Sequence, residues 1–315
     1  MAFATTGALA YVPGTLSEQR SLVWVDRQGR EQPLGAEPRA YANPRVSPDG
    51  TRIAVTMRDA SRDVWIWDVG RRTLKQLTSD PAPNYLAAWF PDSKRLAFSA
   101  EIGDVSQIHW QAADGSGIAR ALTQGPRHAF PNAISRDGSS LVLMDVVRQP
   151  FESDIGVLQL ENHARRILRK TAEIERNAAI SPDGRWLAYE SDRSGRFEIY
   201  VRPFPNVEDA EHKITTDGGT APVWAHSGRE LFYWKQSGAI VSIMAVPISP
   251  GQAFDFGTAH QIAQGGYARP IFDRQYDVAP DGRFVLMKPV GRPPRDEIVI
   301  VLNWFEELKR LVPTR

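Results

Sequence analysis

The chain has 315 residues, of which 42% are hydrophobic and 24% charged, which is typical of a globular protein with a large core. The formal net charge of +1 excludes the strongly basic surface that nucleic-acid binding requires. Cysteine is absent, so disulfides, thiolate metal sites and cysteine nucleophiles are excluded.

The first 35 residues predict three strands. Residues 8–12 and 22–25 are short apolar runs, and residues 30–35 form a more polar third run. A degenerate turn, Thr5-Thr6-Gly7, precedes the first of them. These strands are therefore expected to form an N-terminal sheet unit.

A turn motif then recurs along the chain. Ser47-Pro48-Asp49-Gly50 returns as Ser181-Pro182-Asp183-Gly184, with weaker copies centred on residues 92, 137, 227 and 281. The steps between the third positions are 43, 45, 46, 44 and 54 residues. Regular self-similarity of this length is typical of repeat architectures.

The motif residues have structural roles in a hairpin. Proline presets φ at the first turn position, aspartate accepts hydrogen bonds from backbone N–H groups ahead of it, and glycine adopts the left-handed conformation. The repeated aspartates are thus predicted to be turn residues that lie on a ring and do not converge on a site. They are Asp49, Asp92, Asp137, Asp183 and Asp281.

Each repeat predicts four strands. An apolar strand follows the turn, as at residues 52–55; a second strand follows a polar gap, as at 64–67; a mixed outer strand comes next, as at 74–78; and a short strand runs into the next turn, as at 87–89. A four-stranded sheet buries both faces when such sheets stack radially. The prediction is an all-β propeller over residues 1–302, with seven blades preferred. Six blades are the alternative, with the N-terminal strands completing the last sheet.

The tail over residues 303–315 departs from the repeat. Trp304, Phe305, Leu308 and Leu311 recur at helical spacing, with charged residues between them. We predict a short amphipathic helix docked on the propeller; a hook for a partner domain is the alternative.

The repeat resembles the TolB-type, or PD40, propeller repeat of bacteria. Residues 191–200, Ser-Asp-Arg-Ser-Gly-Arg-Phe-Glu-Ile-Tyr, are similar to its linker and strand, and Leu77-Thr78 to its outer strand. Residues 22–31 and 303–309 also resemble the extracytoplasmic propeller of some bacterial serine/threonine protein kinases. Similar propellers precede the hydrolase domain of prolyl-oligopeptidase-like peptidases, but no Gly-x-Ser-x-Gly occurs in this chain.

Candidate ligand-binding residues lie just before the predicted inner strands, where a propeller forms its central funnel. These positions differ from blade to blade, whereas the packing positions repeat. The candidates are Tyr85, Phe130, Arg176, Thr220 and Arg274. The six histidines lie more than five residues apart, so no local pair of metal ligands is predicted. No catalytic residue and no cofactor is predicted either.

We therefore expect a non-catalytic, monomeric module that binds a protein, a peptide or a small ligand at the funnel. The alternatives are a metal-dependent lactonase or lyase, for which Asn43, Asn132 and Asn177 are candidate ligands, and a propeller separated from a peptidase. The kinase resemblance implies a periplasmic or extracytoplasmic location. No apolar run of about 18 residues and no signal peptide is evident, so a cytoplasmic location is the alternative.

Overall fold

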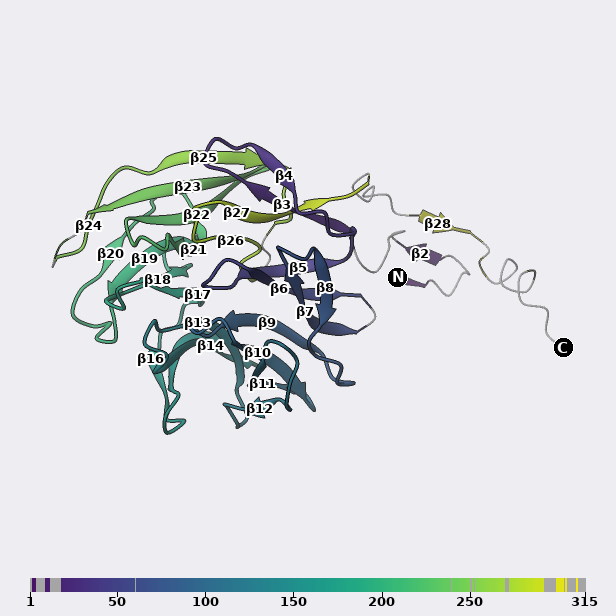
Figure 1. The fold of residues 1–315 in the computed structure, drawn as a ribbon, viewed down its shortest axis with the longest axis horizontal. Coiled ribbons are helices and arrows are strands. Elements are labelled where there is room, and N and C mark those ends of the chain that lie inside the picture. Colours follow the sequence, from purple (N-terminus) through teal and green to yellow (C-terminus); the bar gives the residue numbers. More distant parts are fainter. Residues whose placement is uncertain are drawn as a thin grey trace.

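The computed structural model describes residues 2–3, 9–11, 18–59, 61–238, 240–249, 251, 253–269, 272–291, 299–302, 304 and 310. Six antiparallel sheets form a ring, and each contributes one blade of a β-propeller (Figure 1). The predicted all-β propeller of four-stranded blades is confirmed. The preference for seven blades was wrong, because the N-terminal strands belong to the sixth blade.

Blades 1 to 4 each run from the axis outward in chain order. Blade 1 comprises β5 (Tyr41–Val46), β6 (Arg52–Arg58), β7 (Arg62–Asp68) and β8 (Thr73–Gln76). Blade 2 comprises β9 (Asn84–Trp89), β10 (Arg95–Ile102), β11 (Val105–Ala112) and β12 (Arg120–Ala121). Blade 3 comprises β13 (His128–Ile134), β14 (Ser140–Arg148), β15 (Phe151–Gln159) and β16 (Arg165–Arg169). Blade 4 comprises β17 (Glu175–Ile180), β18 (Trp186–Ser191), β19 (Glu198–Pro203) and β20 (His212–Lys213).

Blade 5 and blade 6 depart from this plan. Blade 5 comprises β21 (Thr220–Trp224), β22 (Glu230–Ser237), β23 (Ile240–Ser249) and β25 (His260–Gly265), and β24 (Asp255–Phe256) also pairs with β23. Blade 6 takes its inner strands, β26 (Asp277–Val278) and β27 (Phe284–Pro289), from late in the chain. Its outer strands are β3 (Arg20–Val25) and β4 (Glu31–Pro33), which come from the beginning (Figure 1).

The ring is closed by the pairing of β27 with β3. Met287 lies opposite Leu22, and Phe284 lies opposite Val25. The last repeat lacks an outer strand of its own, so its free edge takes up the apolar run at residues 22–25. By its position in the repeat, the apolar run at residues 298–301 is predicted to be the second strand of the last blade. It contains β28 (Val299–Val301) instead, which pairs with β2 (Leu9–Tyr11), and β2 pairs with β1 (Ala2–Phe3).

Two further predictions concern the N-terminal turn and the C-terminal tail. The degenerate turn at residues 5–7 lies outside the described residues. Of the C-terminal tail, Trp304 and Arg310 are described, and both are helical. The docking of that tail stays a prediction.

Tryptophan side chains join neighbouring blades near the axis. The indole Nε1 of Trp89 in blade 2 donates a 2.9 Å hydrogen bond to the backbone oxygen of Arg45 in blade 1. Trp224 in blade 5 donates likewise to Ala179 in blade 4, at 3.0 Å. Both tryptophans stand directly before a turn motif, so the repeat places the same inter-blade bond in two pairs of blades.

Candidate functional site

A short segment between blades 5 and 6 crosses the central channel at one end. The side-chain Nδ2 of Asn177 donates to the backbone oxygen of Phe272 at 3.0 Å, and the Asn177 Oδ1 accepts from the backbone nitrogen of Arg274 at 3.2 Å. On the opposite side, the backbone nitrogen of Asn43 donates to the Gln275 side chain at 3.3 Å. Asn43 lies in blade 1 and Asn177 in blade 4, which face each other across a ring of six. Residues 272–275 therefore close this end of the channel.

The other end of the channel holds a cavity of about 450 Å³. The inner strands of all six blades line it, through Arg45, Ala88, Asn132, Ala179, Val223 and Asp277. The turn residues Pro48, Pro91, Arg136, Pro182 and His226 also border it. Its volume falls within the range of small-molecule sites. We call it the axial cavity.

Three charged side chains from blades 1 and 6 lie together in the axial cavity. A side-chain nitrogen of Arg274, Nη2, lies 3.3 Å from the Asp277 Oδ1, and the two side chains are 13% and 11% exposed. The other Asp277 oxygen accepts a 2.9 Å hydrogen bond from the backbone nitrogen of Val46. Arg45 is 8% exposed and uses its Nη1 to bond the backbone oxygens of Pro44 and Arg274, at 2.8 and 3.1 Å. Two cations and one anion leave this group with a net charge of +1.

The environment of Arg45 disfavours its charge. Burial lowers the pKa of Arg45 to about 9, and the neighbouring charge of Arg274 acts in the same direction, while Asp277 opposes both. In addition, the Nε atoms of Arg45 and Arg274 are buried and have no hydrogen-bond partner among the described residues. An added anion would relieve both the electrostatic and the hydrogen-bonding cost.

The axial cavity also contains a serine, a histidine and an aspartate, the residue types of a hydrolytic triad. Ser181 donates its hydroxyl to Asp183 at 2.5 Å, and the backbone nitrogen of Trp186 donates to that hydroxyl at 3.0 Å. Ser181, His226 and Asp277 all lie in the described part of the chain, and no hydrogen bond joins any two of them. Within the described parts of the chain, no cluster of three or more His, Cys, Asp or Glu side chains could hold a metal ion.

The five predicted funnel residues occupy one equivalent position, five residues before each turn motif. Tyr85 and Phe130 lie near each other, with ring centroids 6.1 Å apart, and the Tyr85 hydroxyl is 2.7 Å from the Ser106 hydroxyl. Thr220 begins β21, where it pairs with Trp234. Four of these five residues are absent from the lining of the axial cavity, and Arg274 is the one that contributes to it.

Arg176 forms a buried contact of its own. It makes an ion pair with Glu190, which is fully buried, and its guanidinium lies 4.1 Å from the centroid of the Phe197 ring. The same guanidinium lies 5.5 Å from the ring of Phe272, in the segment that closes the channel. The structure therefore places Arg176 beneath the closing segment, where it contributes to the closed end.

The turn aspartates all have the same local geometry. In each turn a side-chain oxygen accepts from the backbone nitrogen two residues later, at 2.8 to 3.2 Å; the aspartates are Asp49, Asp92, Asp137, Asp183 and Asp281. Hydrogen bonds from the Ser135 hydroxyl and the Ser139 backbone lower the pKa of Asp137. Glycine follows in four of these turns, for example Gly184 with φ of +75°.

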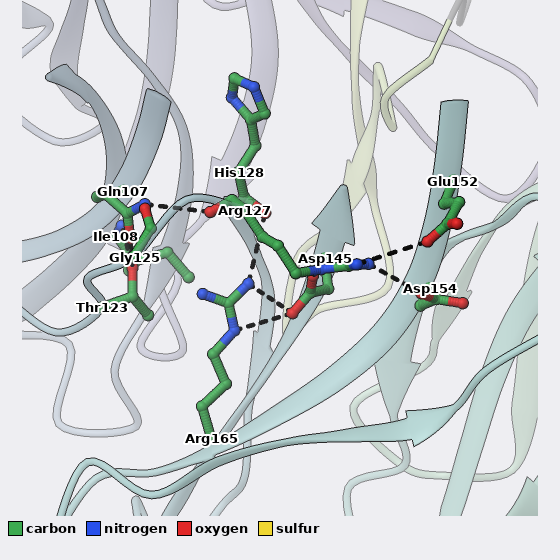
Figure 2. A network of polar contacts seen from close by, with 10 residues as sticks. All are labelled: Gln107, Ile108, Thr123, Gly125, Arg127, His128, Asp145, Glu152, Asp154 and Arg165. Carbon is green, nitrogen blue, oxygen red and sulfur yellow. Dashed lines mark hydrogen bonds and ion pairs between the residues drawn. The ribbon is translucent and has the colours of Figure 1, made fainter. Parts of the chain in front are cut away.

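A second group of buried charges lies within blade 3, away from the axial cavity. Arg127 reaches between Asp145 on β14 and Asp154 on β15, and Arg165 on β16 also bonds Asp145 (Figure 2). The two aspartates are 2% and 1% exposed. Because the arginines and carboxylates bond one another, this group ties three strands of the blade together.

The residues of the axial cavity that sequence reasoning missed are Arg45, Arg136, His226 and Asp277, whereas Asn132 was named there only as a candidate metal ligand. The signal was a departure from the repeat. Arg45 and Asp277 stand two residues before the turn, where other blades have alanine or valine. Arg136 and His226 occupy a turn position that is proline in the other four copies.

The sequence of this chain is similar to that of known proteins over part of its length. Residues 3–152 match the family described as PD40, TolB beta propeller domain. Over 147 residues the chain is 29% identical to the WD repeat-containing protein SL1-17 of Schistosoma mansoni, covering 47% of this chain and 46% of that protein. Over 99 residues it is 32% identical to the Tol-Pal system protein TolB of Anaeromyxobacter dehalogenans, covering 31% and 22%. The chain thus spans less than half the length of these curated relatives.

Solved structures share the architecture at low sequence identity. A protein assigned to TolB from Agrobacterium tumefaciens superimposes with a TM-score of 0.70 at 17% identity, covering 88% of this chain and 100% of that one. An oligogalacturonate lyase in complex with manganese has a TM-score of 0.56 at 14% identity, covering 92% and 84%. Similarity at this level shows the fold alone.

No helix in the described part of the chain has the length and apolar character to cross a membrane. The turn repeat, the six blades and the match over residues 3–152 lead to one conclusion: this chain is a six-bladed β-propeller whose N-terminal half is similar to the PD40, TolB beta propeller domain.

Proposed function

We propose that this protein is a non-catalytic binding module whose ligand enters the axial cavity. One observation carries the proposal: the channel is closed at one end by residues 272–275 and holds a 450 Å³ cavity at the other, lined by side chains that break the repeat. Residues that serve packing alone recur from blade to blade. Arg45, Arg136, His226 and Asp277 do not recur, and they gather in one place.

The chemistry of the cavity supports binding over catalysis. The Ser181 hydroxyl is held by the turn, and Asp277 is held by Val46 and Arg274. A metal-dependent lactonase or lyase would require several oxygen or nitrogen ligands around one cation. Of the asparagines considered for that role, Asn43 and Asn177 hold the closing segment and only Asn132 lines the cavity.

An extracytoplasmic location is part of this proposal. It is supported by the resemblance of residues 22–31 to kinase-linked extracytoplasmic propellers. Fractionation of the native host, with an antibody against the propeller, tests the location.

A screen of a mixed small-molecule and short-peptide library by ligand-observed NMR tests the binding function. Ala133→Phe places a ring in the axial cavity, and Ala253→Phe adds the same ring at an exposed position as the control. We expect library members that bind the wild-type protein and the control but not Ala133→Phe. Binding that survives Ala133→Phe, or a screen with no binder, overturns the proposal.

A further inference from the structure

We propose that the ligand of the axial cavity carries a single carboxylate, bound by Arg45 and Arg274, and an apolar body. The inference rests on the proposed function, since it names the chemistry that the cavity selects. The carboxylate can belong to a small organic acid or to the C-terminus of a peptide.

The first argument is the hydrogen-bonding of Arg45. Its Nη1 is engaged by two backbone oxygens, but its Nε has no partner, and no described residue accepts from its Nη2. Nε and Nη2 lie on one edge of the guanidinium, and this edge matches the two oxygens of a carboxylate. Arg45 is 8% exposed and lines the axial cavity, so a carboxylate bound there would supply the partners that this edge lacks.

The second argument is charge. Among the side chains that line the cavity, Arg45 and Arg274 supply two positive charges and Asp277 supplies one negative charge, so this group is balanced by one monoanion. Asp273 also acts on Arg45 but does not line the cavity, and burial raises its pKa, which favours its neutral form. A phosphate, with a charge near −2, would meet repulsion from Asp277 without a third buried cation to offset it. Arg136 is exposed at the turns, where solvent screens its charge.

The third argument is the remaining wall of the cavity. Apart from the charged group it consists largely of small and apolar side chains: Val46, Ala88, Trp89, Ala133, Ile134, Ala179, Ile180, Val223 and Trp224. Such a wall favours an aliphatic or aromatic body over a polyhydroxylated one. Asn132, whose Oδ1 is buried without a partner among the described residues, offers one acceptor to a donor such as a peptide N–H.

The experiment compares four probes by isothermal titration calorimetry: 4-methylpentanoate, its amide, the tripeptide Ala-Ala-Leu, and the same tripeptide with an amidated C-terminus. We expect at least one of the two acids to bind, and its amide to bind about tenfold or more weakly, because a charge-assisted hydrogen bond is lost. The acid that binds identifies the source of the carboxylate. Equal binding of an acid and its amide overturns the inference, and so does the absence of binding by all four probes.

Two substitutions with opposite expected effects separate recognition from structural damage. Arg45→Gln should weaken binding of the acid about tenfold or more, whereas Asp277→Asn raises the net charge of the site and should tighten it. Asparagine keeps an oxygen for the Val46 backbone nitrogen. Arg136→Gln, which makes the same charge change at an exposed position, should alter affinity about twofold at most. Weaker binding by Asp277→Asn contradicts the inference.

Failure of this inference is distinguishable from failure of the proposed function. If neutral library members bind and are blocked by Ala133→Phe while neither acid binds, the cavity is a binding site of different chemistry. If Ala133→Phe blocks nothing, the cavity is not the site at all.

Discussion

The side-chain oxygen of Asn177 accepts a 3.2 Å hydrogen bond from the backbone nitrogen of Arg274, which joins the inner strand of blade 4 to the segment leading into blade 6. A second bond of 3.0 Å, from the Asn177 Nδ2 to the Phe272 oxygen, fixes the same segment. One asparagine thus holds the closed end of the channel, and its contribution can be measured.

Asn177→Ala should lower the free energy of unfolding by about 1–3 kcal/mol and speed amide exchange at Arg274, because two hydrogen bonds are lost. The backbone should accept alanine, since Ala221 occupies the equivalent position of blade 5 with φ of +54°, the same value as Asn177. Urea unfolding and hydrogen exchange measure the two effects. The exposed Asn162→Ala serves as control; unchanged exchange at Arg274 contradicts the assignment.

Asp183→Ala should cost about 1 kcal/mol or more of stability, because the Ser181 hydroxyl and the Arg185 backbone nitrogen lose their acceptor. Asp183→Ser should cost less. The turn of blade 5 already has serine at this position, where the Ser227 hydroxyl accepts from the Arg229 backbone at 3.3 Å. Thermal unfolding measures both variants. Loss of ligand binding by Asp183→Ala at unchanged stability would show that this aspartate is more than a turn residue.

Stability should decline between about pH 4 and pH 7 through Glu175. Burial raises the pKa of Glu175 to about 7, against the opposing contact with Arg169, while the unfolded value is about 4.3. A carboxyl with a raised folded pKa binds its proton more tightly in the folded state. Its contribution is complete below the unfolded pKa and is lost as the pH rises through the folded pKa.

Urea unfolding at pH 4, 5, 6, 7 and 8 tests this expectation. Glu175→Gln should flatten the decline over that interval, because glutamine remains neutral throughout. Glu161→Gln, at an exposed position, should leave the profile unaltered. A Glu175→Gln profile as steep as that of the wild type would assign the decline to other groups.

A disulfide between positions 21 and 288 should lock the ring. Ser21 on β3 lies opposite Lys288 on β27, and the chain has no other cysteine to interfere. Because the bridge would enclose most of the chain, Ser21→Cys combined with Lys288→Cys should stabilise the oxidised protein by about 3–5 kcal/mol. Non-reducing electrophoresis and urea unfolding with and without reductant measure it. The single variants are the references, because Lys288→Cys by itself removes the 2.7 Å ion pair of Lys288 with Glu31. Failure of the pair to oxidise contradicts the six-blade closure.

The sequence was sufficient to predict the blades but not their number. Ser-Pro-Asp-Gly is a local signal, and the strands that follow it pair within about 20 residues, so residues 47–68 predict the turn, β6 and β7 correctly. The apolar run at residues 22–25 looks the same whether it begins a blade of its own or completes the last one. Its partner is decided by which sheet has a free edge, and that is a property of the assembled ring.

The site shows a similar division. The sequence argument used variation among the equivalent positions five residues before each turn, and these positions lie toward the closed end of the channel. Of those five residues, Arg274 alone lines the axial cavity, because its segment crosses the channel. Sequence periodicity does not show which end of the channel holds the cavity. The cavity is marked instead by Arg45 and Asp277, which stand at positions where the other blades have alanine or valine.

Pairing of β3 with β27 has a consequence for biosynthesis. Residues 20–25 leave the ribosome early, yet the edge that they complete is made only when residues 284–289 have followed. During that interval the nascent chain carries an apolar strand without a partner, a known source of association between chains. A second nascent chain offers the same edge, so the competing product is a domain-swapped pair in which each chain lends its early strand to the other. Crowded polysomes, where such chains are closest together, should favour that product most.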